Sequence, residues 1–434
     1  MLLGWSMPIL EPAVETLGRA QLERLQFERL QALFERMRDG NDFCRERFGG
    51  VAAPRALADL PALPFTKKSD LRDAYPLKML QVPIEQLARI HASSGTSGVP
   101  TIGPYTKRDL EIFAEVNARS LASGGARPGD LFQISWGYGL FTGGLGMHGG
   151  AERLGACVIP ASSGNTARQM QLLETLPIAG IGCTPSYAVL LAERFEAEQR
   201  RPLALRYLIA GAEAWTPQMR DDIERRLGVI ATNIYGLTEI IGPGVAQECP
   251  EAKAGLHVQE DHFLPEIIDP VTLQPLPDGT LGELVITTLT REAMPVLRYR
   301  TGDLTSIRRE RCACGRTTAR MAWITGRVDD MLVIRGINVF PTAIEELLLG
   351  FTELTPNYQI IVERPPNGLD TLHVEVEHRS AARDADHRAL ESAVVKKLAE
   401  FLLVTLTIRV VAPGTLARVE AGKAKRVDDR RALA

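Results

Sequence analysis

The sequence predicts an α/β protein in which a large N-terminal domain of helix-covered sheets, with a β-rich subdomain, is followed by a small α+β C-terminal domain. Three patterns support this prediction. Short apolar segments alternate with amphipathic helical segments from about residue 130 to 240, strands and turns dominate from about 255 to 325, and a new α+β pattern begins after Asp330. We therefore divide the chain into residues 1–327 and 328–434, with a hinge at residues 327–330.

The N-terminal part begins with helices. Apolar side chains three and four positions apart, with charges between them, predict helices within residues 12–48. A Pro-Phe-Thr loop then leads into a further helix, for which Ser69 or Asp70 would be the N-cap. Beyond it, strand and helix patterns alternate in the order typical of a largely parallel sheet, with strands at 157–160, 178–184 and 207–211 and helices at 166–176 and 185–199.

The chain from about residue 255 onward has a different pattern. A Pro-Asp-Gly turn at residues 277–279 precedes the strand-like segment 282–288, as expected in a β-rich subdomain. After Asp330 we expect strands at residues 331–334, 358–363, 371–377 and 406–411, and helices at 341–349 and 387–403. These elements would form a compact domain of about 100 residues, which is an ordinary domain size.

Composition excludes several classes of protein. The chain has 434 residues, of which 45% are hydrophobic and 24% charged, and its net charge of −3 provides no electrostatic attraction for nucleic acid or an anionic membrane. It contains no uncharged apolar run of about 18 residues, and its N-terminus lacks the basic region and cleavage site of a signal peptide. Six scattered cysteines favour a reducing compartment, so we expect a cytoplasmic protein.

One segment is rich in glycine and hydroxyl side chains: Ser93-Ser94-Gly95-Thr96-Ser97-Gly98-Val99-Pro100-Thr101. Such a loop offers backbone N–H and hydroxyl donors to a polyphosphate. No Gly-Lys-Ser/Thr follows at the spacing of a Walker loop, so this is not a P-loop of that kind. Taken alone, the segment is also compatible with an ordinary linker.

Four further motifs follow this loop: Tyr235-Gly236-Leu237-Thr238-Glu239, Tyr299-Arg300-Thr301-Gly302-Asp303-Leu304, Gly326-Arg327-Val328-Asp329-Asp330 and Gly422-Lys423. In this order, the five motifs resemble the signature series of the acyl-adenylate-forming enzymes. The resemblance implies ATP, Mg²⁺ and a carboxylic acid that attacks the α-phosphorus of ATP while pyrophosphate leaves. It also implies that the C-terminal domain is mobile.

The resemblance assigns roles to the nucleotide motifs. The loop would close over the β- and γ-phosphates, although Val99 stands where the family usually has a lysine; Lys107 or another base would then compensate. Tyr235 would pack against adenine, Thr238 would donate to the α-phosphate, and Glu239 would hold Mg²⁺ through carboxylate oxygen. The ATP-binding candidates are Ser93, Ser94, Gly95, Thr96, Ser97, Gly98, Glu213, Ala214, Asn233, Ile234, Tyr235, Gly236, Thr238, Asp303 and Arg327.

Three further implied roles belong to charged side chains. Asp303 would accept both ribose hydroxyls, and Arg327 would bind the ribose or a phosphate from the linker. Lys423 would stabilise the charge that develops between the attacking carboxylate and the α-phosphate. The catalytic candidates are therefore Lys423, Thr238 and Glu239.

Longer segments at residues 136–148, 183–187, 241–249, 255–263 and 336–341 resemble the phenylacetate–coenzyme A ligases within this superfamily. That family implies two steps: an aryl acid and ATP give aryl-AMP and pyrophosphate, and the thiol of coenzyme A then displaces AMP. It also implies that the C-terminal domain rotates between the steps, presenting Lys423 for the first and the Gly336 region for the second. We assign Asp329, Arg335 and Gly336 to the hinge and the coenzyme A site, and homodimerisation stays open.

Three aromatic residues, Trp136, Tyr138 and Phe141, lie in a glycine-rich segment. Flat rings separated by glycines suit a slot for a planar aryl group, although they also suit a core beneath a loop. The family usually has tyrosine in place of Trp136, so a substituted phenylacetate, indoleacetate, anthranilate or benzoate-type acid stays open. The acid-binding candidates are Lys68, Trp136, Tyr138, Phe141, Ala212, Ala214, Gly236 and Pro243.

Cysteines provide a separate signal. Cys312 and Cys314 are one residue apart on a predicted turn, and Cys249 with His257 would complete a tetrahedral set for structural zinc. Buried free thiols and a redox role are the alternatives. Nothing in the pattern indicates catalytic zinc.

Two other functions compete with an aryl acid–coenzyme A ligase. An adenylating enzyme that loads the phosphopantetheine thiol of a carrier protein has the same first step, and both acceptors end in the same arm. The other function is a zinc-stabilised nucleotide-binding module without turnover. The presence of Glu239, Asp303 and Lys423 together argues against that module.

Overall fold

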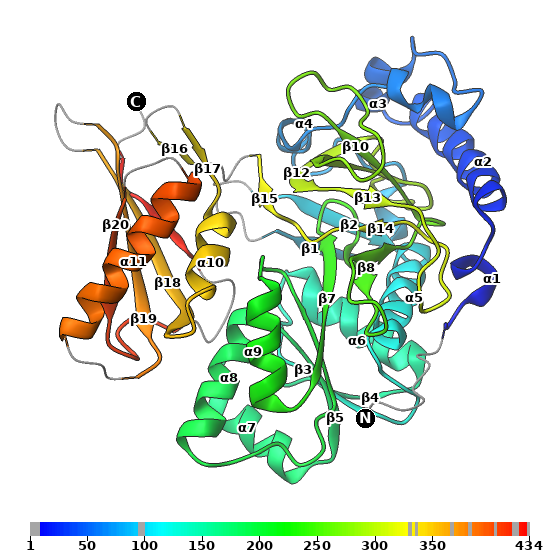
Figure 1. Cartoon of the computed structure of the whole chain (residues 1–434). Helices are drawn as coiled ribbons and strands as arrows, with labels where there is room; N and C mark the ends of the chain where they lie inside the picture. Colours follow the sequence, from blue (N-terminus) through cyan, green and yellow to red (C-terminus); the bar gives the residue numbers. More distant parts are fainter. Residues whose placement is uncertain are drawn as a thin grey trace. The chain divides into compact units, whose positions relative to one another are not determined.

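The computed structural model describes residues 9–93, 100–328, 332–334, 337–364, 369–380, 384–402, 406–418 and 425–431 (Figure 1). Its internal contacts divide the chain into two compact units. The first comprises residues up to Thr184, Arg201–Ala212 and Val229–Trp323, and the second comprises Pro185–Arg200, Glu213–Gly228 and the chain from Ile324. The predicted domain boundary at residues 327/328 remains a prediction.

The first unit opens with helices, as predicted for residues 12–48. These are α1 (Pro12–Glu15), α2 (Arg19–Arg38) and α3 (Asp42–Phe48), followed by η1 (Leu57–Ala62), α4 (Lys68–Asp73) and η2 (Ile84–Gln86). The prediction that Ser69 or Asp70 caps α4 is wrong, because Lys67 is the N-cap. Asp70 lies one turn inside the helix, where its carboxylate accepts a 2.7 Å hydrogen bond from the Lys67 N–H.

A mixed sheet dominates the first unit. Among the described residues its order is β13-β14-β9-β8-β7-β6-β5-β3-β4. Neighbouring strands from β4 to β7 are parallel, as the alternating pattern predicted, whereas β7, β8, β9, β14 and β13 pair antiparallel. The strands are β3 (Leu131–Ile134), β4 (Cys157–Ile159), β5 (Ile178–Cys183), β6 (Tyr207–Gly211), β7 (Ile230–Leu237), β8 (Gly242–Glu248), β9 (Leu256–Val258), β13 (Ile307–Arg308) and β14 (Arg320–Met321).

Helices α5 (Lys107–Ser123) and α6 (Thr142–Leu154) pack against this sheet, and α7 (Thr166–Thr175) lies between β4 and β5 in the chain (Figure 1). The sequence did not reveal α6, because its glycine-rich run is typical of a loop. The glycines instead let α5 and α6 approach closely: a Cβ on Gly150 would lie 2.4 Å from Cβ of Asn117.

The β-rich subdomain is confirmed. Strands β10 (Phe263–Ile268), β11 (Gly282–Thr288) and β12 (Tyr299–Thr305) pair antiparallel. A separate hairpin of β1 (Leu87–Ala92) and β2 (Ile102–Thr106) brackets the glycine- and hydroxyl-rich loop. Gly302 has a φ of +78° and lies where the register between β11 and β12 shifts, so β12 bulges immediately before Asp303.

The second unit has its own core. Its described strands include a sheet of order β20-β19-β18-β21, against which α10 and α11 pack (Figure 1). The sequence analysis did not predict β21. The elements of the second unit are α8 (Pro185–Ala197), α9 (Pro217–Leu227), β15 (Gly326–Arg327), β16 (Leu332–Ile334), β17 (Ile337–Val339), α10 (Pro341–Leu349), β18 (Leu354–Glu363), β19 (Thr371–His378), α11 (Asp384–Leu402), β20 (Thr407–Val411) and β21 (Val427–Asp429).

Candidate active site

The carboxyl edge of the parallel strands collects several candidate residues. Trp136 follows β3, Ala212 follows β6, and Tyr235 lies near the end of β7. Because β3, β6 and β7 run in the same direction, these three positions lie at one edge of the sheet. Ligands in open parallel sheets bind at this edge, so the sheet topology brings together residues of the predicted ATP and acid sites.

The backbone at the end of β6 is unusual. Ala212 has a φ of +73°, a left-handed conformation that is uncommon and costly for a residue with a Cβ. It is exposed, as is Ala214. Within the second unit, the Glu213 carboxylate accepts hydrogen bonds from the backbone N–H of Ser186 (3.2 Å) and its hydroxyl (2.9 Å).

Tyr235 and Asp303 meet although they belong to different motifs and different sheets. The Tyr235 hydroxyl donates a 2.6 Å hydrogen bond to Oδ2 of Asp303. Asp303 is buried, and the bulge at Gly302 sets the direction of its side chain. The residues predicted to hold adenine and ribose are therefore neighbours.

Thr238 and Glu239 lie in the tight turn between β7 and β8. The backbone N–H groups of Ile240 and Ile241 both donate to the carbonyl oxygen of Leu237, which closes the turn. Thr238 is 5% exposed and Glu239 7% exposed. A buried hydroxyl and a buried carboxylate next to each other provide a donor for phosphate and a hard oxygen ligand for Mg²⁺.

The ends of the predicted phosphate loop are held together. The Ser93 N–H donates to the Thr101 carbonyl oxygen, and the Thr101 N–H donates to Oγ of Ser93, both at 2.9 Å. Lys68 begins α4 and is exposed, and Arg327 lies on β15. Several predicted site residues lie outside the described part of the chain: Ser94, Gly95, Thr96, Ser97, Gly98, Asp329, Arg335, Gly336 and Lys423.

The three aromatic candidates have different environments. Trp136 is 5% exposed and packs over Gly182, where a Cβ would lie 2.4 Å from the indole ring. Phe141 is half-buried at the N-terminus of α6, and its ring covers Gly143. Trp136 is therefore part of the core, whereas Tyr138 and Phe141 keep partly open faces.

Three of the acid-site candidates, Phe141, Gly236 and Pro243, lie near the start of α6. Gly236 on β7 pairs with Pro243 on β8. Next to Pro243, a Cβ on Gly242 would lie 2.8 Å from Cβ of Thr142, the neighbour of Phe141. The residues on α6 and β7–β8 thus form one wall.

A polar chain that the sequence analysis missed begins at Tyr138. Its hydroxyl lies 3.1 Å from Nδ1 of His148, and Nε2 of His148 lies 3.1 Å from Oε1 of Glu152. Burial raises the pKa of the Tyr138 phenol, so this group stays neutral. The spacing of four between His148 and Glu152 was the available signal, but it is visible only once α6 is known to be a helix.

The four predicted zinc ligands come together. Their ligand atoms lie within 4.8 Å of one another. The Cys249 and Cys312 sulfurs are 3.7 Å apart, close to the edge of about 3.8 Å for a tetrahedron with Zn–S bonds of about 2.3 Å. The Cys314 sulfur lies 3.4 Å from Nε2 of His257, whose other nitrogen lies 3.3 Å from the Thr318 hydroxyl.

The thiols of this cluster differ in acidity, because hydrogen bonding to Cys314 and burial raise the pKa of Cys249. Burial alone would raise the pKa of Cys312, but its hydrogen bond to His257 lowers it. Hydrogen bonding to Cys249 lowers the pKa of Cys314 as well. Thiolates are the form that binds zinc.

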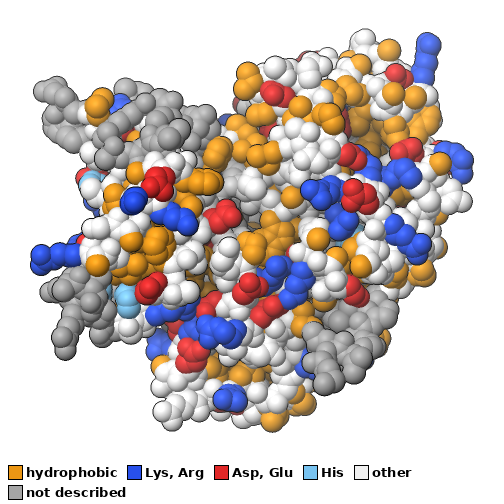
Figure 2. Space-filling model, in the orientation of Figure 1, with side chains coloured by type: hydrophobic (Ala, Val, Ile, Leu, Met, Phe, Trp, Pro, Cys, Tyr) orange, Lys and Arg blue, Asp and Glu red, His pale blue; other side chains and the backbone are white. Residues whose placement is uncertain are grey.

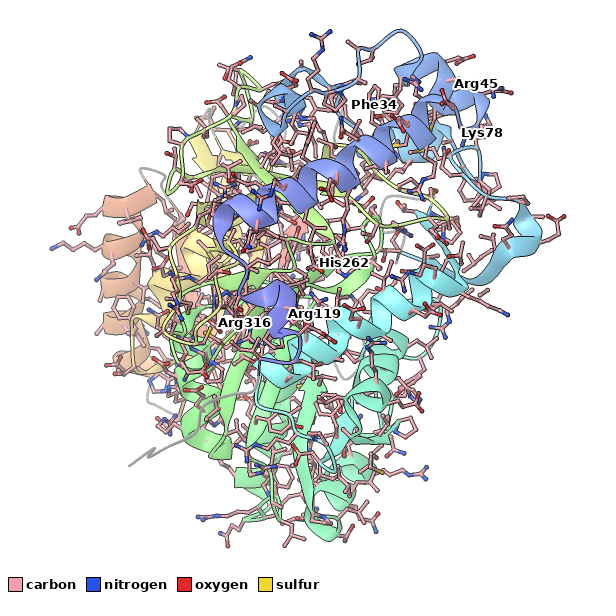
Figure 3. The ribbon with its side chains drawn as sticks, turned by 90° about the vertical axis from the view of Figure 1, so that its right-hand side faces the viewer. Phe34, Arg45, Lys78, Arg119, His262 and Arg316 are labelled. Atoms are coloured by element: carbon pink, nitrogen blue, oxygen red, sulfur yellow. The ribbon has the colours of Figure 1, made fainter. Side chains whose placement is uncertain are left out.

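Glu115, Asp261 and His262 form a second group of potential ligands. Figure 3 shows His262 of this group between α2 and α5. Arg119 donates to Asp261 at 2.9 Å and also contacts Glu115. Two further arginines, Arg29 and Arg153, lie within 3.8 Å of these carboxylates. With the carboxylates already neutralised, this cluster is a structural ion-pair network rather than a metal site.

The surface carries both signs of charge. Figure 2 shows lysine and arginine side chains interspersed with aspartate and glutamate over the described residues of this face. None of the described helices combines the length and apolar character needed to cross a membrane.

Comparisons with known proteins agree with this geometry. A family model described as AMP-binding enzyme matches residues 51–290, and another described as AMP-binding enzyme C-terminal domain matches residues 336–431. The chain is 50% identical to a phenylacetate-coenzyme A ligase of Thermus thermophilus, over 97% of this chain and 99% of that protein. It therefore belongs to the AMP-binding enzyme family and, within that family, to the phenylacetate–coenzyme A ligases.

Solved structures support the same conclusion. A 2-hydroxyisobutyryl-CoA ligase in the postadenylation state, in complex with R3-HIB-AMP, has a TM-score of 0.89 and 29% identity, covering 96% of this chain and 91% of that one. The same ligase in the thioesterification state, with 2-HIB-AMP and CoA, has a TM-score of 0.71 and 30% identity, covering 97% and 92%. The predicted family, α/β fold and enzyme class, an AMP-forming acid–CoA ligase, are confirmed.

Proposed function

We propose that this chain joins phenylacetate, or a closely related aryl acid, to coenzyme A in two steps through an aryl-adenylate. The observation that carries the proposal is the contact between Tyr235 and Asp303 beside the buried Thr238–Glu239 turn. Adenine and ribose recognition and phosphate chemistry then share one edge of the sheet. The phenylacetate-coenzyme A ligase of T. thermophilus, half identical over nearly the whole chain, supports the choice of acid and acceptor.

In the first step, the aryl carboxylate attacks the α-phosphorus of ATP and pyrophosphate leaves. Thr238 would donate to the α-phosphate, and Asp303 would accept the ribose hydroxyls while the Tyr235 ring covers adenine. Mg²⁺, held by Glu239, would neutralise phosphate charge. Lys423 would stabilise the charge between the carboxylate and the phosphorus.

In the second step, the thiolate of coenzyme A attacks the carbonyl carbon of the aryl-adenylate and AMP leaves. We assign Asp329, Arg335 and Gly336 to the face of the C-terminal domain used here, and Lys423 to the other face. Structures of the 2-hydroxyisobutyryl-CoA ligase in a postadenylation state and in a thioesterification state support such an alternation for that relative.

The acid site would be lined by Tyr138, Phe141 and the wall formed by Gly236 and Pro243. Trp136 would support this site from the core, and Lys68 would supply a cation for the carboxylate. A flat, monocyclic acid fits apolar and aromatic surroundings. Benzoate-, anthranilate- and indoleacetate-type acids are the competing substrates.

We also propose that Cys249, His257, Cys312 and Cys314 hold one structural zinc ion. The clustering of the four ligand atoms and the distance between the Cys249 and Cys312 sulfurs support this site. All four ligands are protein atoms, which is typical of structural rather than catalytic zinc. A homodimer and a cytoplasmic location stay predictions.

Acid-dependent ATP–pyrophosphate exchange tests the function. Phenylacetate should support exchange better than benzoate, anthranilate, indoleacetate or a long-chain fatty acid, and adding coenzyme A should release AMP and the thioester. Exchange without thioester formation, together with loading of a phosphopantetheinylated carrier protein, would favour the carrier-loading enzyme instead. A lack of exchange with every acid would refute adenylation altogether.

A further inference from the structure

Arg291 is a buried cation beside the turn that carries Thr238 and Glu239. It lies between β11 and β12 and is 1% exposed. Its Nη1 donates to the carbonyl oxygens of Glu239 (2.7 Å) and Ile240, and its Nη2 donates to that of Pro104 (3.3 Å). Pro104 lies on β2, the strand that follows the predicted phosphate loop. One guanidinium therefore ties together the two segments that would surround the triphosphate.

Arg291 differs from other buried arginines in its partners. Arg298 is equally buried, but it pairs with Glu266 at 2.8 Å. Within the described part of the chain, no carboxylate lies within ion-pair distance of Arg291, whose guanidinium carbon lies 5.2 Å from the centre of the Tyr105 ring. A buried charge without a counterion is costly, so packing alone does not explain an arginine here.

The backbone around Arg291 is held firmly. The buried Asp109 accepts the N–H of Glu292 through Oδ1 (2.7 Å) and the N–H of Ala293 through Oδ2 (2.9 Å). Asp109 also forms the capping box of α5 with Thr106, whose hydroxyl donates to Glu292 at 2.8 Å. The guanidinium thus projects from a segment fixed to a long helix.

The space between Arg291 and the turn is filled. A Cβ on Gly103 of β2 would lie 3.3 Å from both Cγ2 and the carbonyl oxygen of Thr238, and 3.6 Å from Nη2 of Arg291. In such close packing, the position of Thr238 depends on where β2 and the guanidinium lie. Removal of the guanidinium would release both carbonyl oxygens of the turn.

We propose that Arg291 is a positioning residue for adenylation: its guanidinium holds the Glu239 and Ile240 carbonyls against β2 and so aims the Thr238 hydroxyl and the Glu239 carboxylate at the α-phosphate and Mg²⁺. The inference rests on the proposed function, because it assumes that the turn meets ATP. It predicts a defect confined to the nucleotide step. Lysine would keep the charge but not the fork that reaches three carbonyls.

The test compares Arg291→Met and Arg291→Lys with Arg298→Lys, a matched buried arginine whose carboxylate partner retains a cation. For each purified variant, we would measure phenylacetate-dependent ATP–pyrophosphate exchange over a range of ATP and Mg²⁺ concentrations. Thioester formation from preformed phenylacetyl-adenylate and coenzyme A would be measured separately. Arg291→Met should lower exchange by roughly 10²-fold and raise the Mg²⁺ requirement, because small displacements of catalytic groups have effects of this size.

Arg291→Lys should recover part of the exchange, and both variants should make thioester at nearly the wild-type rate. Arg298→Lys should lower thermal stability but leave the Mg²⁺ requirement unchanged. The inference would be overturned if Arg291→Lys lost both half-reactions equally or showed a normal Mg²⁺ requirement. This outcome can be measured even if Arg291→Met fails to fold. Lack of exchange in the wild-type protein would instead refute the proposed function itself.

Discussion

The hydroxyl of Tyr235, on β7, donates a 2.6 Å hydrogen bond to Oδ2 of Asp303, on β12. The contact joins the parallel sheet to the β-rich subdomain across 68 positions of sequence. Under the proposed function, this hydrogen bond orients the carboxylate that receives the hydroxyls of the ribose. The structure thus couples two motifs that are separate in the sequence.

Asp303→Ala should weaken ATP binding, since the ribose would lose a charge-assisted partner; we expect the KM for ATP to rise by roughly tenfold or more. Tyr235→Phe keeps the ring but removes the donor to Asp303, so its effect should be smaller. The double variant should show less than the sum of the two losses. Exchange kinetics with ATP varied measure all three, and unchanged values would place the ATP site elsewhere.

Lys423→Ala should reduce adenylation by about 10²–10³-fold, the scale of losing a main transition-state donor. Thioester formation from preformed aryl-adenylate should survive, because the proposed second step uses another face of the C-terminal domain. Lys425→Ala is the matched control, two residues away and exposed. If Lys423→Ala slowed both half-reactions equally in folded protein, domain alternation would be wrong.

Phe141→Ala should raise the KM for phenylacetate by roughly tenfold and leave the KM for ATP nearly unchanged, because a hydrophobic contact to the ring would be lost. The adjacent Leu140, which is 66% exposed, provides a control variant, Leu140→Ala, with little expected effect. Steady-state kinetics with phenylacetate and acetate distinguish the cases. A matching loss with acetate would make Phe141 a structural residue only.

Purified protein should contain about one equivalent of zinc by elemental analysis. Chelation should lower the melting temperature, because a ligand that binds only the folded state stabilises it. Cys312→Ser should abolish zinc binding, whereas Cys157→Ser, at an exposed thiol, should not. Adenylation at low temperature should persist in the metal-free protein.

Loss of zinc should also loosen the N-terminus. Arg316, two residues after Cys314, donates to Glu15 at 2.6 Å, and the Thr317 N–H donates to the Glu15 carbonyl oxygen. Limited proteolysis after chelation should therefore cut before or within α2 sooner than in the zinc-bound protein. The zinc proposal would be wrong if the purified protein contained no metal and all six thiols could be titrated after unfolding.

Glu115 should contribute to stability in a pH-dependent way. His262, whose Nε2 lies 3.7 Å from the Glu115 carboxylate, and the charge of Arg119 lower the pKa of Glu115 from 4.5 to about 2. Because the folded-state pKa is below the unfolded one, this stabilisation is complete above about pH 4.5 and disappears as the pH falls towards 2. Glu115→Gln should cost about 1–3 kcal/mol at pH 7 and progressively less below pH 4.5.

Thermal unfolding of the wild type and Glu115→Gln from pH 7 to 3 measures this difference. Glu111→Gln, on the same helix but in an exposed pair with Arg108, should change stability little at any pH. A constant difference between the wild type and Glu115→Gln across this range would contradict the pKa argument.

Much of the fold was predictable because it depends on local patterns. Parallel strands between helices, the β-rich subdomain and most C-terminal elements follow from periodicity over neighbouring residues. The helix α6 was not predictable in this way, since its glycines suit a loop and become favourable only against α5. The N-cap of α4 was misplaced by two or three residues, because several polar side chains nearby suit a cap.

The sequence by itself determined the family, the enzyme class and the order of the motifs, because residues such as Asp303 and Glu239 stand in recognisable local contexts. Only the tertiary structure decided which of them meet: Tyr235 with Asp303, the four zinc candidates with one another, and Arg291 with the Thr238–Glu239 turn. Arg291 stands in no motif from which its role could be predicted. Its role arises from a long-range contact, and such contacts depend on how sheets and helices pack rather than on neighbouring residues.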